Sequence, residues 1–242
     1  MIKFFRKIRQ QLILENKMGK YFKYAIGEII LVVIGILIAL QINNWNEARK
    51  LSIKETIYLK GLKADFEQSK LALARVIKKT DRVSKMADTL ATMIKKNGNE
   101  LTAIQIDTLT GSSTGFTVFM PSEGVINDII GSGKLDMISN KELREHIASW
   151  QADLEMIREF EGIGKDMSTK YSDYTSKYFD LVNAKFGIPA FLGTKRIEFL
   201  NDHVLTNYMA QIFGNSNVLN ELYNEKLIEI DSLIAIIDKE LK

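Results

Sequence analysis

The chain has 242 residues and a net charge of +3, enough length for one large domain or two small ones. Hydrophobic residues make up 46% and charged residues 26% of the sequence, which is typical of a folded protein and excludes a disordered one. The sequence has no cysteine, which excludes a disulfide scaffold, a thiolate zinc site, an iron–sulfur cluster and cysteine catalysis.

The first 23 residues are strongly basic. They contain seven lysines and arginines against one acidic residue, Glu15, and apolar residues recur between them at helical spacing. This pattern predicts an amphipathic cytoplasmic head over residues 1–23 that lies on anionic lipid. The rest of the chain then carries a net negative charge, which argues against a nucleic-acid partner.

A membrane-length apolar segment follows the head. Residues 25–42 contain no lysine or arginine, and about twenty helical residues cross a hydrocarbon core of roughly 30 Å. Their isoleucines, leucines and valines favour insertion by about −4 to −7 kcal/mol, whereas Glu28 opposes it by at most about 3 kcal/mol. We therefore predict a transmembrane helix over residues 24–43 rather than a buried core helix.

Five residues define the predicted membrane anchor. Tyr24 and Trp45 flank the apolar run in the manner of interfacial aromatic belts. Gly35 and Ala39 are four residues apart, which allows close helix approach in the membrane. Glu28 is either a functional intramembrane carboxylate or a side chain that reaches back to the interface. No small-residue cleavage motif follows, so an uncleaved signal anchor is favoured over a cleaved signal peptide.

The distribution of basic residues also predicts an orientation. Seven lysines and arginines precede the span, whereas four follow it within a similar distance. By the positive-inside rule, the N-terminus is then cytoplasmic and the C-terminal domain lies outside. The expected location is the bacterial inner membrane, with a single pass and a periplasmic domain.

A long helical seam follows the membrane segment. Mostly apolar residues recur at three- and four-residue spacing from Leu59 to Ile94, over about five heptads. We predict a coiled-coil-like stalk helix over residues 44–98 that ends at the turn Asn97-Gly98-Asn99. The seam must be buried, either by self-association of the stalk into a homo-oligomer or by packing within the chain's own bundle.

Two short helices are expected next. Thr102 and Gln105 have the spacing of a capping box, which opens a helix to about residue 111. Residues 116–119 are consistent with a brief strand or an apolar loop. Pro121 then favours a helix start, and Gly133 marks its end.

A longer helix is expected after residue 138. Ser139 and Glu142 have the spacing of a second capping box, and apolar residues continue with helical periodicity. We predict that this helix bends at Gly162 and Gly164 and ends at residues 187–189.

Two further helices are predicted near residues 195–213 and 217–241. The fold class is therefore all-α, with an N-terminal transmembrane helix that continues into a long stalk helix and an antiparallel helical bundle. The bundle domain is assigned to residues 99–242, packing with residues 44–98.

Two stretches resemble a known family. Residues 1–47, from the basic head through AIGEIILVVIGILIALQINNWNE, are similar to the opening of a bacterial family of single-pass membrane proteins with no assigned function. Residues 121–147, PSEGVINDIIGSGKLDMISNKELREHI, resemble the middle region of that family. The resemblance implies a membrane anchor and a helical domain, and no activity.

No catalytic or metal-binding motif stands out in the sequence. There is no Walker A loop, dinucleotide fingerprint, HExxH or nucleophile elbow. His146 and Glu142 share a helix face, but a structural metal site needs four ligands, so a solvated face is favoured. His203, beside Asp202, is interpreted in the same way. We expect no catalytic, metal or cofactor-binding residues, no cofactor and no enzymatic activity.

An aromatic stripe is the one candidate ligand face. Tyr171, Tyr174 and Tyr178 recur at helical spacing, which suits either a pocket between helices or, more often, the bundle core. The function expected is a non-catalytic membrane-anchored scaffold or interaction protein of the cell envelope, with the lipid bilayer and either further copies of itself or another envelope protein as partners. The alternative is a periplasmic ligand-sensing domain that acts through a partner protein.

Overall fold

The computed structural model describes residues 18–97, 101–180, 182–183, 186, 188, 190–191 and 195–242. Its helices are α2 (Met18–Asn97), α3 (Ala103–Ser112), α4 (Gly124–Gly131), the 3-10 helix η2 (Leu135–Met137), α5 (Lys141–Thr175), α7 (Lys195–Asn201) and α8 (His203–Glu240). Strand-like pairing within the described residues is limited to an isolated bridge between Phe179 and Phe191. The predicted all-α fold is confirmed.

The chain divides into two compact units, residues 1–55 and residues 56–242, and the boundary falls within α2. The described part of the first unit is helical, and its large apolar side chains from Phe22 to Ile53 are exposed. The predicted head lies mostly in residues 1–17, outside the described residues.

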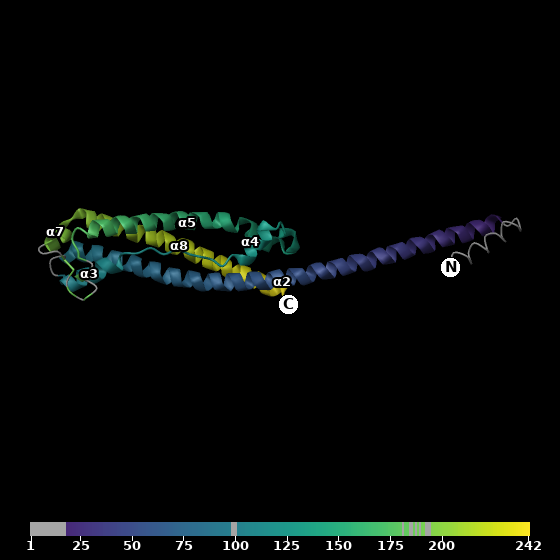
Figure 1. The fold of residues 1–242 in the computed structure, drawn as a ribbon, viewed down its shortest axis with the longest axis horizontal. Helices are drawn as coiled ribbons and strands as arrows, with labels where there is room; N and C mark the ends of the chain where they lie inside the picture. Colours follow the sequence, from purple (N-terminus) through teal and green to yellow (C-terminus); the bar gives the residue numbers. More distant parts are fainter. Residues whose placement is uncertain are drawn as a thin grey trace. The chain divides into compact units, whose positions relative to one another are not determined.

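Three long helices form the second unit: the C-terminal part of α2, α5 and α8 (Figure 1). Ion pairs join Lys63 to Asp238 and Lys70 to Asp231, so α8 is antiparallel to α2. The α5 helix is also antiparallel to α8 and therefore runs in the same direction as α2. This parallel pair requires a long return connection, which residues 113–123 provide as an extended segment along the bundle (Figure 1).

The α2 seam is buried inside its own bundle. Leu59, Leu62 and Phe66 belong to one core cluster, whereas Ala87 and Leu90 belong to a second. The apolar surface that predicted a self-associating stalk is therefore covered by the other helices of the same chain. These residues are buried by packing within the chain's own bundle, which is the second of the two alternatives. The homo-oligomer stays a prediction, but burial of this seam does not require it.

Local capping explains where the short helices begin. The predicted capping box of Thr102 and Gln105 is present at the start of α3. Helix α4 begins at Gly124 rather than at Pro121, and its own N-cap side chain makes no capping bond. The Asp65 side chain of α2 caps it instead, because Asp65 Oδ2 accepts the Val125 N–H at 2.8 Å.

Three predicted helix boundaries were wrong. The N-cap of α5 is Asn140 rather than Ser139, because Asn140 Oδ1 accepts the Leu143 N–H at 2.9 Å. Helix α5 ends at Thr175, well before the predicted stop at residues 187–189, of which 187 and 189 lie outside the described residues. The last two helices divide at Asp202, which caps α8, so residues 203–240 form one helix.

The corrected cap of α5 is testable by alanine substitution. Asn140→Ala removes the side chain that accepts the Leu143 N–H, and it should lower the free energy of unfolding by about 1 kcal/mol. Ser139→Ala should cost less than that, because Ser139 is not the capping residue. Urea unfolding of the two variants, followed by circular dichroism, measures the order of the two effects, and a reversed order would contradict the assignment.

Candidate functional site

A layer of polar side chains separates the two core clusters of the bundle. We define this polar layer as Thr80, Ser84, Thr117, Glu161, Ser216 and Asn217. The first core cluster lies on one side, with Phe66 and Trp150, and the second lies on the other, with Ala87 and Met209. A buried polar layer is expensive unless its groups are paired, so its hydrogen bonds decide whether it is tolerated.

The hydrogen bonds of the polar layer join every long element of the bundle. Glu161 is 4% exposed, and its Oε1 accepts the Phe119 N–H at 2.6 Å and the Tyr223 hydroxyl at 2.7 Å. These two bonds connect α5 to the extended segment and to α8. A single carboxylate oxygen thus holds three parts of the chain in register.

Two further bonds connect the layer to α2. Thr80 Oγ1 lies 2.7 Å from Thr117 Oγ1, and the Ser84 hydroxyl donates to Asn217 Oδ1 at 2.7 Å. Together with the bonds of Glu161, they close a ring of contacts from α2 through the extended segment, α5 and α8 back to α2. The layer is therefore well paired, as a stable buried network requires.

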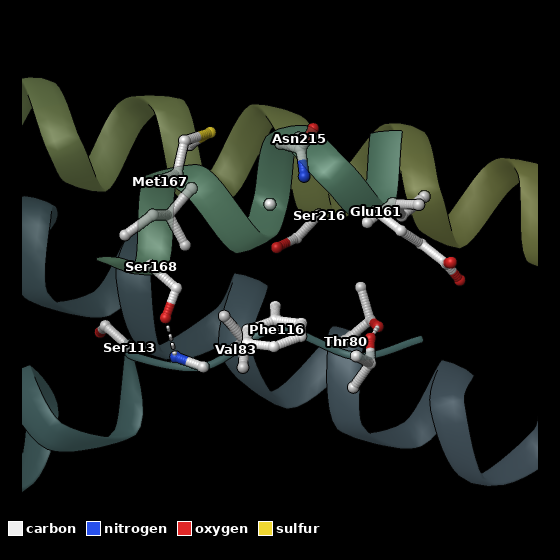
Figure 2. Close-up of a pocket in the computed structure, with 14 residues that line it drawn as sticks. Thr80, Val83, Ser113, Phe116, Glu161, Met167, Ser168, Asn215 and Ser216 are labelled. Atoms are coloured by element: carbon white, nitrogen blue, oxygen red, sulfur yellow. Dashed lines mark hydrogen bonds between the residues drawn. The ribbon is translucent and has the colours of Figure 1, made fainter. Parts of the chain in front are cut away.

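A small cavity of about 30 Å³ lies within this layer. Figure 2 shows Glu161, Asn215 and Ser216 on one side of it and Thr80 and Val83 on the other. Since one water molecule needs at least about 10–15 Å³, the cavity has room for about two. The cavity is large enough for water molecules but too small for an organic ligand.

Gly164 of α5 allows close packing at this level. A Cβ atom at Gly164 would lie 3.0 Å from the Asn215 Nδ2, so a larger residue would crowd α8. Asn215 in turn donates to the Phe160 carbonyl of α5 at 3.3 Å. The sequence predicted a bend at Gly162 and Gly164 within a continuing helix. Helix α5 runs without a break through both positions, and Gly164 lies at a close contact with α8.

Burial raises the pKa of the Glu161 carboxyl above its ordinary value of 4.5, because the charged form loses hydration. The hydrogen bonds from the Phe119 N–H and the Tyr223 hydroxyl oppose this shift without cancelling it. Burial, followed by the neighbouring Glu161 carboxylate, likewise raises the pKa of the Tyr223 hydroxyl. Tyr223 therefore acts as a hydrogen-bond donor in this network rather than as an acid.

A second, larger cavity of about 340 Å³ adjoins the first. Gly115 and Ser168 line both of them, and Ser168 Oγ accepts the Gly115 N–H at 3.3 Å (Figure 2). Gly115 has φ +111°, a conformation that favours glycine, where the chain leaves α3 and enters the extended segment. The volume is in the range of cavities that hold small organic molecules.

The three predicted tyrosines lie in the second core cluster. Tyr171, Tyr174 and Tyr178 are at most 7% exposed, and none of them lines either cavity. The Tyr174 and Tyr178 hydroxyls donate to Asp202 Oδ2 at 2.9 and 3.0 Å. The three tyrosines thus belong to the bundle core, and the Asp202 carboxylate accepts hydrogen bonds from two of them.

Asp202 also shows how the fold uses a half-buried carboxylate. Burial by itself raises the pKa of Asp202, but hydrogen bonds from the Val204 N–H, Tyr174 and Tyr178 together outweigh it, so the pKa lies below its usual value. The same carboxylate caps α8. The Asp202 carboxylate therefore caps α8 and accepts hydrogen bonds from the two tyrosine hydroxyls.

The predicted anchor residues all lie on α2 in the first unit. Tyr24 and Trp45 are 55% and 64% exposed, and Arg49 lies 6.0 Å from the centre of the Trp45 ring. Apart from its chain neighbours and the backbone of its own helix turn, no described atom lies within 4 Å of a Cβ placed at Gly35. Ala39 is exposed, and Glu28 is partly buried. Tertiary packing does not bring these five residues together.

The histidines do not assemble a metal site within the described residues, where no group of three histidine or carboxylate ligands occurs. His146 Nδ1 lies 3.3 Å from Glu229 Oε1 of α8. Glu229 in turn pairs with Lys226, which is 5% exposed and lies over the Trp150 ring. His203 is exposed beside Asp202, at 3.9 Å.

Glu161 and its partners were not singled out by the sequence. Ser69 and Thr80 do interrupt the apolar seam of α2, and Thr80 marks the level of the polar layer. A polar residue in a seam has many explanations, however. Only the folded arrangement shows that Glu161 and Tyr223, which are 62 residues apart, meet there.

These features define the chain as a helical-bundle protein, and its described residues include one helix long and apolar enough to span a membrane. Residues 28–187 match the Family of unknown function (DUF6090), and the chain belongs to this family. The expected resemblance to a family without an assigned function is thereby confirmed. No curated protein and no solved structure matches the chain.

The electrostatic cost of Glu161 is testable through its pH dependence. Since the folded pKa lies above 4.5, the native protein keeps a proton that the unfolded chain has released, so this group costs stability as the pH rises from 4.5 through the folded pKa. Glu161→Gln keeps an acceptor oxygen and removes the titration. The stability of this variant relative to the parent should therefore increase as the pH rises above 4.5.

Urea unfolding at a series of pH values measures this difference. Glu159→Gln, at an exposed glutamate of the same helix, is the matched control for the change in net charge. A relative stability of Glu161→Gln that falls as the pH rises would contradict the raised pKa.

Proposed function

We propose that this protein is a non-catalytic, membrane-anchored helical scaffold of the bacterial cell envelope. It spans the inner membrane once through residues 24–43, with the basic head in the cytoplasm and the helical bundle in the periplasm. Its partners are the lipid bilayer and either further copies of the chain or another envelope protein. It uses no cofactor and binds no nucleic acid.

The observation that carries the proposal is the apolar stretch of α2. Its most apolar window has a mean hydropathy of 2.6 and is not covered by any part of the chain that the structure describes. The exposed side chains include Ile29, Leu31, Ile36 and Leu37, all more than half exposed. A bilayer is the environment that such a surface requires. The basic residues before it support the proposed orientation.

The structural use of the carboxylates supports a non-catalytic role. Glu161 joins α5 to α8 and to the extended segment, Asp202 caps α8, and Asp65 caps α4. Each of these groups already has hydrogen-bond donors from the fold itself. Carboxylates that are paired in this way stabilise the bundle, and this supports a structural role rather than a catalytic one.

A row of exposed apolar side chains supports binding to another protein. The extended segment alternates, so that Phe119 is buried while Phe116, Val118 and Met120 are exposed. Met120 is 76% exposed, the highest value among the large apolar residues described. Exposed apolar surface of this kind is typical of interaction sites.

The ligand-sensing alternative is favoured by a different observation, the cavity of about 340 Å³ beside α3 and α5. In that case the bundle binds a small molecule and passes the signal to a partner protein. The two roles differ in what the bundle recognises, a protein surface or a small molecule, so they are tested separately.

The membrane topology is testable by cysteine labelling, because the chain has no native cysteine. In intact cells, a membrane-impermeant maleimide should label Gln211→Cys, an exposed position on α8, once the outer membrane is permeabilised. Lys3→Cys in the head should react only after the inner membrane is disrupted. Labelling of the head before the bundle would overturn the proposed orientation.

The scaffold role is testable by photo-crosslinking in the native membrane. A photoreactive amino acid at Met120 should crosslink to one other polypeptide, which mass spectrometry identifies as a second copy or as another envelope protein. The control carries the same group at Glu225, an exposed polar position on α8. No crosslink at Met120, or the same products at both positions, would count against the proposal.

A further inference from the structure

An open groove of about 490 Å³ lies on the bundle surface between the extended segment and α5. Val118 and Met120 line it from the extended segment, and both are exposed. Methionine adapts its shape to irregular apolar neighbours, which suits a surface that a partner covers. A pocket for a small molecule encloses most of its ligand, whereas an open groove fits a segment of another chain better.

The α5 side of the groove is open because residue 162 is a glycine. Gly162 lies in the interior of the 35-residue helix α5, where glycine is less favourable than alanine. Apart from its chain neighbours and the backbone of its own helix turn, no described atom lies within 4 Å of a Cβ placed there. At Gly164, by contrast, a Cβ would crowd Asn215. The packing of the described chain thus explains Gly164 but not Gly162, whose spare room lies in the groove.

Two cations flank Gly162 on the same face of α5. Arg158 and Lys165 also line the groove, four residues before Gly162 and three residues after it. The seven residues between the two cations correspond to about 10 Å along the helix. The Arg158 side chain is 44% exposed and pairs with Glu155 at 3.1 Å. The Lys165 ammonium has no ion-pair partner within the described residues.

The two glutamates that line the groove already accept hydrogen bonds from the fold. Glu123 Oε1 accepts the Trp150 indole N–H at 2.8 Å, and Glu161 Oε1 accepts its two bonds inside the polar layer. Within the described residues, neither glutamate forms an ion pair with Arg158 or Lys165. A carboxylate from outside the chain is therefore the complementary group for the exposed cations.

We infer that this groove binds an acidic segment of another envelope protein. An apolar side chain of that segment packs against Met120 and over Gly162, and a neighbouring carboxylate pairs with Lys165 or Arg158. The inference rests on the proposed scaffold function and adds the chemistry by which the partner is recognised. A second copy of the chain and an anionic lipid are other occupants, which the test distinguishes.

The test uses the full chain in its native membrane, with a photoreactive amino acid at Met120. After irradiation and digestion, mass spectrometry identifies the crosslinked molecule and the position of the crosslink. We expect a segment of a different polypeptide with net negative charge, and with an aspartate, a glutamate or a terminal carboxylate within about four residues of the crosslink. A crosslink to a second copy, to a phospholipid or to a segment without such a carboxylate would overturn the inference.

Two variants test the recognition itself. Lys165→Glu replaces the attraction with repulsion, and Gly162→Leu fills the groove from α5. Each should lower the yield of the Met120 crosslink at least about threefold. The matched controls are Lys170→Glu and Ala152→Leu, at exposed positions of α5 outside the groove, which should keep the parental yield.

A charge exchange separates recognition from a structural effect. Lysine in place of the mapped partner carboxylate should restore the yield with Lys165→Glu and lower it with the parent. Circular dichroism verifies that each variant is folded, and leucine is a better helix former than the glycine it replaces.

The outcomes separate this inference from the scaffold proposal. No crosslink at Met120 would contradict both. A polypeptide crosslink whose yield is unchanged in a folded Lys165→Glu or Gly162→Leu would overturn the acidic-segment inference and leave the scaffold proposal in place.

Discussion

The bundle depends on one buried carboxylate, Glu161, which accepts hydrogen bonds from the extended segment and from α8 at the same time. A charge taken out of water needs such partners, since an unpaired one would destabilise the fold. Thr80 and Ser84 add α2 to the same network. The polar layer thereby sets the register of three long helices whose apolar cores, on either side, would tolerate sliding more easily.

The parallel pair of α2 and α5 follows from the return segment between them. Residues 113–123 carry the chain back along the bundle in extended form, and their backbone needs hydrogen-bond partners that helices do not provide (Figure 1). Side chains supply them: Glu161 accepts from Phe119, and Ser69 accepts from Ser122. The polar residues inside the bundle are thus partly the consequence of its topology. The cavity of about 340 Å³ that Gly115 lines is a second consequence of this topology.

The apolar segment of residues 24–43 and the bundle segment differ in their apolar pattern within one helix. In residues 24–43 of α2 the large apolar side chains are exposed all around the helix, and no described part of the chain covers them. Beyond residue 58 most of the apolar side chains of α2 are buried within the bundle, and Leu71 and Met93 are exceptions. The change from an all-round to a one-sided apolar pattern marks where the helix begins to pack against the other helices of the bundle.

The sequence by itself determined the all-α class, the apolar membrane-length segment, the helical seam of α2 and the cap of α3, because each depends on spacing within a short window. It misplaced the cap of α5, where Asn140 lies next to the equally plausible Ser139, and it misplaced the boundary between the last two helices, which falls at Asp202. Only the tertiary structure decided that the seam is buried within the chain, that Glu161 meets Tyr223, and that Met120 and Gly162 line one groove. These outcomes depend on contacts between residues far apart in sequence, which no local pattern encodes.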